Sequence, residues 1–281
     1  MTLWLRAKKI LFVFIKYATL LFMAFVSLLP LVSCVITALK SKEEYRLTNV
    51  MSWPKELSFQ NFVETWQLAN MGLAFRNSII VLVFVLVFSI FFGATLAYVL
   101  NRFVFPGRGI IKNLFLFAAL LPGIAMQVSV YRMMYNLGLI NSMFGYIILM
   151  TGTDIISVTI FIQFFENIPK ELDESGIMDG CTYFGVFFKI LFPLLKPAMV
   201  TVMILKGVST YNEYYMANLY LQDKLKHIVV STSLYTFTGP LGNQYNYICA
   251  GVLITMAPAL LVFILCQKQI YGGLAAGAVK A

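Results

Sequence analysis

The chain has 281 residues, of which 60% are hydrophobic and only 12% are charged, and its formal net charge is +9. A soluble globular domain carries roughly 45–50% apolar and about 25% charged residues, so this composition excludes an ordinary soluble protein and indicates a membrane protein. The 21 Lys and Arg residues are scattered singly between apolar runs, which is typical of loops facing anionic lipid and not of a nucleic-acid-binding surface. The single His and the four Cys show no metal-ligand spacing, so the sequence indicates neither a metal site nor a disulfide framework.

Six stretches of the chain are long and apolar enough to cross a membrane. A spanning helix needs about 20 apolar residues, because each residue rises about 1.5 Å through a hydrocarbon core about 30 Å thick. In chain order, the predicted spans are residues 10–39, 78–100, 113–135, 145–165, 194–220 and 247–265. The fourth and fifth are the least regular, since Asp154 lies in one and Lys206 and Glu213 lie in the other, and a charge in lipid is costly. We therefore expect an all-α polytopic membrane protein with six transmembrane helices.

The distribution of positive charge predicts the orientation of these spans. If residues 1–9 form a cytoplasmic N-terminus, twelve Lys and Arg residues fall in cytoplasmic segments and eight in outer ones. The tight loop at residues 101–112 supports this choice, because it holds three positive charges and no acid. The first apolar run is too long for the h-region of a signal peptide, so we expect it to stay as an anchor. We predict one transmembrane domain over residues 10–281, with both termini inside and a cytoplasmic tail at 268–281.

The loop at residues 166–191, between the fourth and fifth spans, is predicted to lie on the cytoplasmic side. Five acids crowd its first fourteen residues: Glu166, Glu171, Asp173, Glu174 and Asp179. Acids in a first helical turn favour a helix that begins after Pro169, and Gly176 and Gly180 predict breaks that leave two short helices. The apolar side chains that we expect to press back onto the bundle are Phe184, Phe187, Phe188 and Ile190. Such a helix–turn–helix is suited to docking a partner, and a solvated loop is the alternative interpretation.

This loop resembles the cytoplasmic signature of ABC importer permeases, which reads Glu-Ala-Ala, three residues, Gly, nine residues, Ile, one residue and Leu-Pro. The matching residues here are Glu174, Ser175, Gly176, Gly180, Ile190, Phe192 and Pro193. Ser175 and Gly176 replace the two alanines, so both positions keep a small residue. Phe192 replaces the leucine, so that position keeps a bulky apolar residue. Asp179 before the glycine is similar to the sugar-transporting branch. We call residues 166–193 the signature segment.

Further matches extend the resemblance over nearly the whole chain and narrow it to the maltose-type carbohydrate permeases. They are Phe75-Arg76-Asn77-Ser78, the stretch from Leu137 to Ser142, Tyr211-Asn212-Glu213-Tyr214 and the ending from Gly273 to Lys280. In the third of these, Tyr211 stands where the family has Trp. The resemblance implies the type I importer permease fold in a bacterial plasma (inner) membrane.

The same resemblance implies the partners and the residues that would meet them. The partners would be a second, non-identical permease subunit, two ATPase subunits, an extracytoplasmic solute-binding protein, membrane lipid and a sugar or oligosaccharide. ATP and Mg would be bound by the ATPase, with no cofactor in this chain, which would be a channel subunit and not an enzyme. The ATPase-coupling residues would be Glu174, Ser175, Gly176, Asp179, Gly180, Ile190 and Pro193. The C-terminal tail would reach the ATPase through Gly277 and Lys280.

Candidates for the sugar path are aromatic and hydrogen-bonding residues in or near the spans. They are Tyr131, Tyr135, Asp154, Tyr211, Asn212 and Tyr214. With 25 Phe and 15 Tyr in the chain, most aromatic residues must serve packing or the interfacial belt. Asp154 should face protein or water; it would either bind sugar hydroxyls or pair with Lys206 or Arg132, and we favour the structural pairing.

Two other classes of protein explain the sequence less well. An ion-coupled secondary transporter would account for charges inside spans, but such proteins carry internal repeats with interrupted helices in two halves, and no convincing halves are present. A membrane enzyme would need a cluster of nucleophile, base or metal ligands. The motif GxxxxGK[ST] does not occur, so ATP hydrolysis has to come from a separate subunit.

Overall fold

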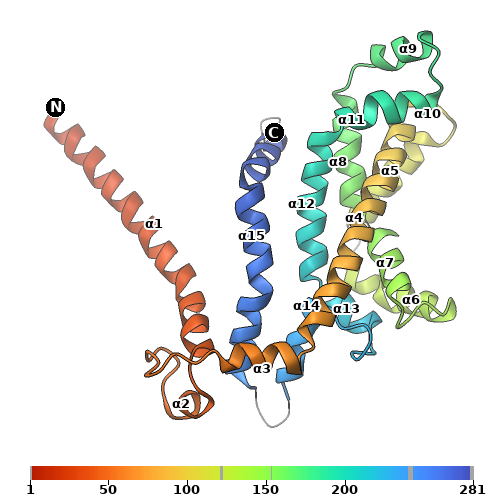
Figure 1. The fold of residues 1–281 in the computed structure, drawn as a ribbon. Helices are drawn as coiled ribbons and strands as arrows, with labels where there is room; N and C mark the ends of the chain where they lie inside the picture. The colour runs from red at the N-terminus through yellow and green to blue at the C-terminus, as the bar shows by residue number, and fades with distance from the viewer. Residues whose placement is uncertain (1, 121–122, 153, 240–242, 279–281) are drawn as a thin grey trace. The chain divides into compact units, whose positions relative to one another are not determined.

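The computed structural model describes residues 2–120, 123–152, 154–239 and 243–278, with side chains from residue 8 to residue 267 of these, apart from 116 and 119. Within these ranges the secondary structure is entirely helical and contains no strand, as the sequence predicts. The chain divides into two compact units, which we describe separately: residues 1–71 with 234–260, and residues 72–233 with 261–281. Figure 1 gives the order of the elements along the chain.

The first unit is built around the ends of two long apolar helices. Its elements are α1 (Thr2–Ala38), α2 (Lys42–Leu47), α3 (Gln60–Leu68), the 3₁₀ turn η2 (Leu234–Phe237) and the first part of α15 (Tyr245–Ala278). The buried amide of Asn61 joins them: its Nδ2 donates to the carbonyls of Ala38 and Lys40, at 2.8 and 2.7 Å. Its Oδ1 accepts from Nδ2 of Asn246 at 2.8 Å. The side chain of Asn61 in α3 therefore links the end of α1 to the start of α15, because its amide nitrogen and oxygen are both hydrogen-bonded.

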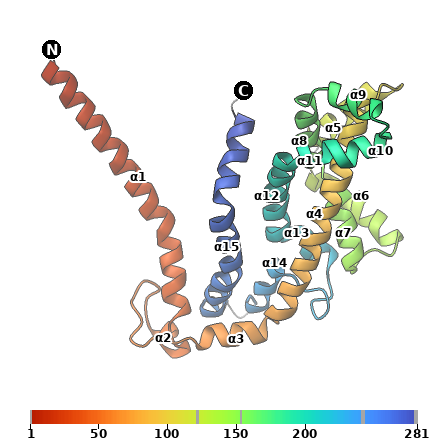
Figure 2. The ribbon, with the colours of Figure 1, turned by 45° about the horizontal axis from the view of Figure 1, so that its top comes forward.

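The second unit contains the remaining elements. They are α4 (Met71–Arg102), α5 (Arg108–Leu120), α6 (Gly123–Asn136), α7 (Met143–Gly152), α8 (Ile155–Glu166), α9 (Glu171–Met178), α10 (Tyr183–Gly185), the π-helical turn η1 (Val186–Leu191), α11 (Phe192–Leu194), α12 (Lys196–Asn212), α13 (Tyr215–Tyr220) and α14 (Val230–Ser233). Helix α8 runs beside α12 in both views of Figures 1 and 2. Helix α4 itself begins at Met71, at the boundary of the two units.

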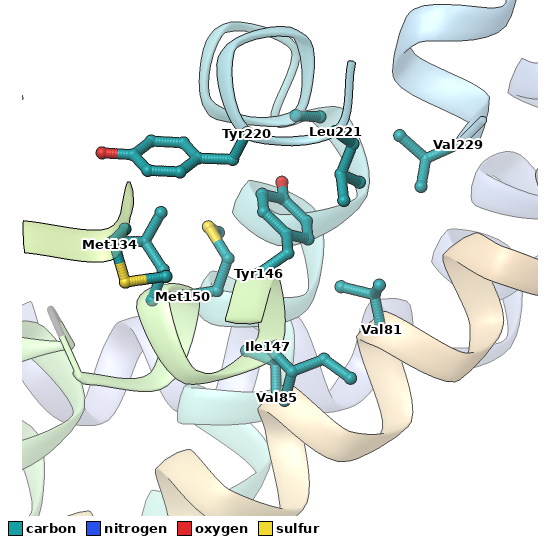
Figure 3. Packing of buried hydrophobic residues seen from close by; sticks show 11 residues of the cluster. Val81, Val85, Met134, Tyr146, Ile147, Met150, Tyr220, Leu221 and Val229 are labelled. Atoms are coloured by element: carbon teal, nitrogen blue, oxygen red, sulfur yellow. The ribbon is translucent and has the colours of Figure 1, made fainter. Parts of the chain in front are cut away.

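Among the described residues of the second unit, two large apolar clusters form most of the core and a small third one surrounds Ala74. In one, Val81 and Val85 of α4 pack with Tyr146 of α7 and Tyr220 of α13, as Figure 3 shows. The other joins α4, α8, η1 and α12, and its buried members are Ala94, Ala97, Tyr98, Phe161, Phe165, Val186, Phe187, Leu191, Leu195, Ala198 and Val202. The small residues of α4 in this second cluster let large aromatic side chains from α8 and η1 lie against the helix.

By length and composition, three helices in the described residues are able to cross a membrane: Lys8–Ala38, Met71–Arg102 and Tyr245–Gln267. The number rises to five if two bent pairs each form one span. These pairs are α7 with α8, at 44°, and the stretch Tyr183–Leu194 with α12, at 70°. The three helices cover the predicted first, second and sixth spans.

Two of the other three predicted spans are not single helices. The third predicted span contains α5 and α6, and residues 121–122 between them lie outside the described part of the chain. The fourth divides at Asp154, which is the N-cap of α8. The fifth divides where α12 ends at Asn212 and α13 begins at Tyr215. Continuous hydropathy did not reveal the last two breaks, because the polar side chains that end these helices lie within otherwise apolar stretches.

Candidate functional site

Helix α9 forms the first half of the signature segment. It begins at Glu171, just after Pro169, and carries Glu171, Asp173 and Glu174 in its first turn. Acids at this position interact favourably with the positive end of the helix dipole. The predicted helix start is therefore confirmed.

Gly176 does not break this helix, contrary to the prediction from sequence. It lies buried inside α9, where an added Cβ would come within 2.7 Å of Cδ1 of Ile190 and 3.1 Å of Cγ2 of Val186. The missing side chain lets α9 lie directly on η1. A glycine inside a helix costs about 1 kcal/mol relative to alanine, and the close packing of the two helical elements opposes that cost.

Gly180 does end the helix, as predicted. Its φ is +86°, a conformation that favours glycine because an L side chain is strained there. The N–H of Gly180 donates to the carbonyl of Ile177, and the N–H of Cys181 donates to that of Gly176, both at 2.9 Å. This pair of bonds is a Schellman motif, which satisfies the last carbonyls of the helix. No neighbouring atom lies within 4 Å of an added Cβ, so the glycine is required here by backbone conformation and not by crowding within the described chain.

The second half of the signature segment folds back onto the core through η1. Phe187 and Leu191 are buried in the cluster with α4 and α8. Phe184 is 77% exposed, so the prediction that it presses onto the bundle is wrong. Phe188 is 46% exposed and is therefore only half-buried. Residues four apart share a helix face, and the face of Phe187 and Leu191 is the buried one. The π-helical turn ends just before Pro193, whose ring has no N–H for a regular helical bond.

The signature residues therefore separate into a buried set and an exposed set. Gly176 and Ile190 contact one another inside the segment. The residues Glu174, Ser175, Asp179, Gly180 and Pro193 are exposed to the surroundings. The hydroxyl of Ser175 donates to the carbonyl of Glu171 at 2.8 Å, within α9 itself. An exposed helix surface with acidic side chains on a well-packed support can receive a partner without rearranging.

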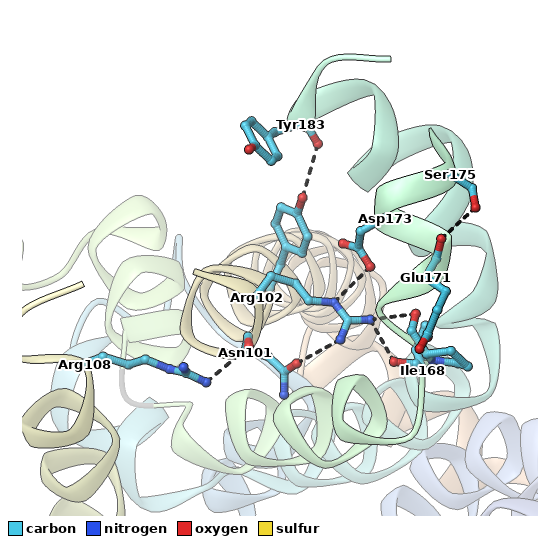
Figure 4. A network of polar contacts seen from close by, with 10 residues as sticks. Asn101, Arg102, Arg108, Ile168, Glu171, Asp173, Ser175 and Tyr183 are labelled. Carbon is cyan, nitrogen blue, oxygen red and sulfur yellow. Dashed lines mark hydrogen bonds and ion pairs between the residues drawn. The ribbon is translucent and has the colours of Figure 1, made fainter. Parts of the chain in front are cut away.

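A buried arginine joins the signature segment to α4, as Figure 4 shows. Arg102 is the last residue of α4, and its side chain is 7% exposed. Its Nη2 donates to the carbonyl of Ile168 at 2.9 Å, and its Nε lies 3.1 Å from Oδ2 of Asp173 in α9. Its Nη1 donates to the side chain of Asn101 at 3.2 Å, and its guanidinium lies 5.9 Å from the ring centroid of Phe165. The sequence interpretation missed this role, because no spacing rule connects residues so far apart in the chain.

Asp173 depends on this arginine for charge compensation. Its side chain is 14% exposed, and no other described residue donates a hydrogen bond to either carboxylate oxygen. Burial raises the pKa of Asp173, and the positive charge of Arg102 acts against that rise. The pair is thus held by charge at short distance, and loss of the arginine would leave the buried carboxylate with only the smaller effect of Lys170 to compensate its charge.

A second buried ion pair lies at the break between α7 and α8. Asp154 accepts from the N–H of Ser157 at 3.3 Å and from its Oγ at 2.6 Å, which caps α8. Its Oδ2 also lies 3.7 Å from Nζ of Lys206 in α12. Lys206 in turn donates to the carbonyl of Met150 at 2.7 Å, near the end of α7. Of the two pairing partners suggested by the sequence, Lys206 is therefore the one that Asp154 contacts.

The other sugar-path candidates lie in different surroundings. Tyr131 of α6 accepts a hydrogen bond from Gln222 at 3.1 Å, and Tyr135 is 67% exposed. Asn212 donates to the carbonyl of Val208 in its own helix at 3.0 Å, and Tyr214 stands between α12 and α13.

Tyr211 lines a cavity of about 10 Å³, which is about the space of one water molecule and far below that of a sugar ring. The other lining residues are Ser78, Val81, Tyr146, Thr210, Val229 and Ser231. The predicted tail contact Lys280 lies outside the described residues, and Gly277 lies in the part of α15 whose side chains are not described.

Together, the long apolar helices and the interrupted spans define the class of protein as a polytopic helical membrane protein. Residues 9–276 match the profile of the family described as "Binding-protein-dependent transport system inner membrane component". The chain belongs to this family. It is therefore an inner-membrane permease component, a non-catalytic subunit of an ABC transport system, which implies ATPase and binding-protein partners.

Individual relatives agree with this assignment. The probable ABC transporter permease protein YurM of Bacillus subtilis is 34% identical over 254 residues, covering 89% of this chain and 83% of the relative. The melibiose/raffinose/stachyose import permease protein MelC of Bacillus subtilis is 32% identical and covers 90% of this chain and 91% of the relative. Among solved structures, a bacterial ABC transporter involved in the import of the acidic polysaccharide alginate superimposes with a TM-score of 0.81 at 21% identity, over 92% of this chain and 96% of that one. This last likeness shows the fold.

Proposed function

We propose that this chain forms half of the translocation channel of a carbohydrate or oligosaccharide importer and couples to an ATPase subunit through the signature segment. The observation that carries the proposal is the arrangement of the helix α9. Its Gly176 packs against Ile190 of η1, and Glu174, Asp179 and Gly180 remain exposed. Relatives over most of the chain support the substrate class, since MelC is named for melibiose, raffinose and stachyose and two AraQ proteins for arabinooligosaccharides.

The proposed topology has six spans of the type I importer fold, with both termini in the cytoplasm. The three long helices and the bent pair of α7 with α8 supply up to four spans, and α12, which follows the signature segment, would supply another. Helices α5 and α6, which occupy the predicted third span, would supply the sixth. The three positive charges at residues 101–112 favour the cytoplasm for the end of α4, and the signature segment would then lie on the side where ATP is available.

The proposed partners follow from that placement. A second, non-identical permease subunit would complete the channel, two ATPase subunits would bind ATP and Mg, and an extracytoplasmic binding protein would deliver the sugar. Glu174 would pair with a basic residue of the ATPase, since it is exposed in the first turn of α9. Gly277 and Lys280 in the tail would add to this contact.

We also propose that this chain contributes little to the choice of sugar. Asp154 is already engaged by Lys206 and Ser157, and the cavity beside Tyr211 holds about one water molecule. A sugar site of useful size would then need surfaces from the second permease subunit, because ligand pockets are typically about 300–1,000 Å³.

Purification of the tagged full-length chain from its own host at native expression tests the proposal. We expect an ATPase subunit, a second permease and a binding protein to co-purify, and we expect mass spectrometry of the recovered binding protein to reveal a bound carbohydrate. Absence of an ATPase from a monodisperse preparation would contradict the proposal. So would carbohydrate uptake that survives ATP depletion and collapses with a protonophore, which is the behaviour of an ion-coupled transporter.

A further inference from the structure

We infer that Arg102 is the residue through which movement of α9 is passed to the membrane span α4, so that it acts as a positioning residue for transport. This inference rests on the proposed function of the signature segment. The covalent chain offers a route from α9 through η1 to α12. Arg102 supplies a separate, side-chain route to a different span.

The contacts of Arg102 fix the beginning of α9 to α4. The guanidinium meets the carbonyls of Ile168 and Pro169 at 2.9 and 3.5 Å, and Asp173 in the first turn of the helix at 3.1 Å. Its Nη2 therefore meets two adjacent carbonyls just before α9, and its Nε forms an ion pair with Asp173 in the first turn. A planar guanidinium holds such a set in fixed geometry, whereas the ammonium of a lysine would act as a point charge.

The end of α4 is suited to receive this movement. Ala94, Ala97 and Tyr98 are buried in the same cluster as Phe165 and Phe187, so the last turns of α4 are packed against α8 and η1. A close-packed interior transmits a displacement instead of absorbing it. A shift of α9 toward an ATPase would thus displace Arg102, and with it the last turns of α4.

The chain offers a matched control in Arg108. This arginine follows the same end of α4, and its Nε donates to the carbonyl of Leu100 at 2.8 Å and its Nη2 to that of Asn101 at 3.1 Å. These bonds tie α5 to α4 and do not involve α9. Figure 4 shows both arginines: dashed lines lead from Arg102 to the signature segment and to the side chain of Asn101, and one leads from Arg108 to Asn101.

The test uses the co-purified assembly in lipid nanodiscs and measures ATP hydrolysis with and without the co-purified binding protein carrying its native carbohydrate. The proposed coupling through the signature segment connects the ATPase to the outer face, so we expect the rate of ATP hydrolysis to change when the loaded binding protein binds there. For Arg102→Gln we expect ATPase subunits to remain bound while hydrolysis loses its response to the binding protein. For Arg108→Gln we expect the wild-type response. Asp173→Asn, which keeps the bonds to Ile168 and Pro169, should lose part of the response.

The outcomes separate this inference from the proposed function. A wild-type assembly without ATPase subunits, or without a response, overturns the proposed function and the inference with it. A responsive wild type together with an equally responsive Arg102→Gln assembly overturns the inference alone. Loss of the ATPase subunits from Arg102→Gln also overturns it, since the residue would then only shape the docking surface. If Arg102→Gln fails to insert, an unchanged response of Asp173→Asn overturns the inference.

Discussion

The signature segment and the break at Asp154 both interrupt long helices, but their polar groups are satisfied in opposite ways. In the signature segment, backbone bonds and a packed glycine complete the turn, and the acidic side chains Glu174 and Asp179 remain exposed. At the break, Asp154 and Lys206 turn toward one another and toward the ends of α8 and α7. A segment in water can leave charge for a partner, whereas polar groups at membrane depth must be satisfied within the protein.

The largest effect is expected from Gly180→Arg, which tests whether the exposed surface of the signature segment binds the ATPase. The strain of a non-glycine residue at φ +86° is only about 1–2 kcal/mol, so the chain should still insert. The new side chain would project from the exposed surface around Glu174, Asp179 and Gly180, where the ATPase is proposed to bind. We therefore expect uptake of the carbohydrate recovered from the binding protein to be lost. Uptake by whole cells and the amount of chain in the membrane fraction are the two measurements.

Gly109→Arg is the matched control for this prediction. Gly109 lies in α5 with no atom within 4 Å of an added Cβ, so it adds the same side chain away from the signature segment. Undiminished uptake by Gly180→Arg, or equal losses in both variants, would contradict the docking role of this face.

Next in size are the effects of breaking the pair at the interrupted span. Asp154→Asn or Lys206→Met each leaves a buried charge without its partner, which typically costs about 3–5 kcal/mol. The double variant Asp154→Asn/Lys206→Met removes both charges and should recover most of that loss. Thermal unfolding of the purified chain in detergent measures the difference. If the loss of stability in the double variant equals the sum of the losses in the two single variants, the ion pair does not stabilise the structure at this break.

The smallest effect concerns the packing of Gly176 on Ile190. Gly176→Ala improves helix propensity by about 1 kcal/mol, but its Cβ would come within 2.7 Å of Cδ1 of Ile190. We therefore expect Gly176→Ala to change the stability of the chain little. In an Ile190→Val background, which lacks Cδ1 and leaves Cγ2 of Val186 at 3.1 Å as the nearest contact, the same substitution should be more favourable than in the wild type, by at most about 1 kcal/mol.

Hydrogen exchange of the α9 amides measures this gain locally. Equal effects of Gly176→Ala in the two backgrounds would show that Ile190 does not limit the size of residue 176. The difference between the signature segment and the break at Asp154 would then lie only in the exposed acidic side chains and not in the packing of Gly176.

The signature segment was the most predictable part of the chain, because its information is local. The acids after Pro169 place the start of α9, and Gly180 places its end, since both follow from backbone geometry within a few residues. Gly176 was misinterpreted as a break. Its effect depends on Ile190, fourteen residues away in sequence, and no local rule contains that contact.

The sequence by itself determined the membrane class, the all-helical fold and the family, because hydropathy and motif spacing are properties of the chain. It did not determine which spans are interrupted, or that Arg102 reaches Asp173 and Lys206 reaches Asp154. Those contacts join residues more than fifty positions apart. Only the tertiary structure decided them, since a buried charge finds its partner through the packing of several helices and not through its neighbours in the chain.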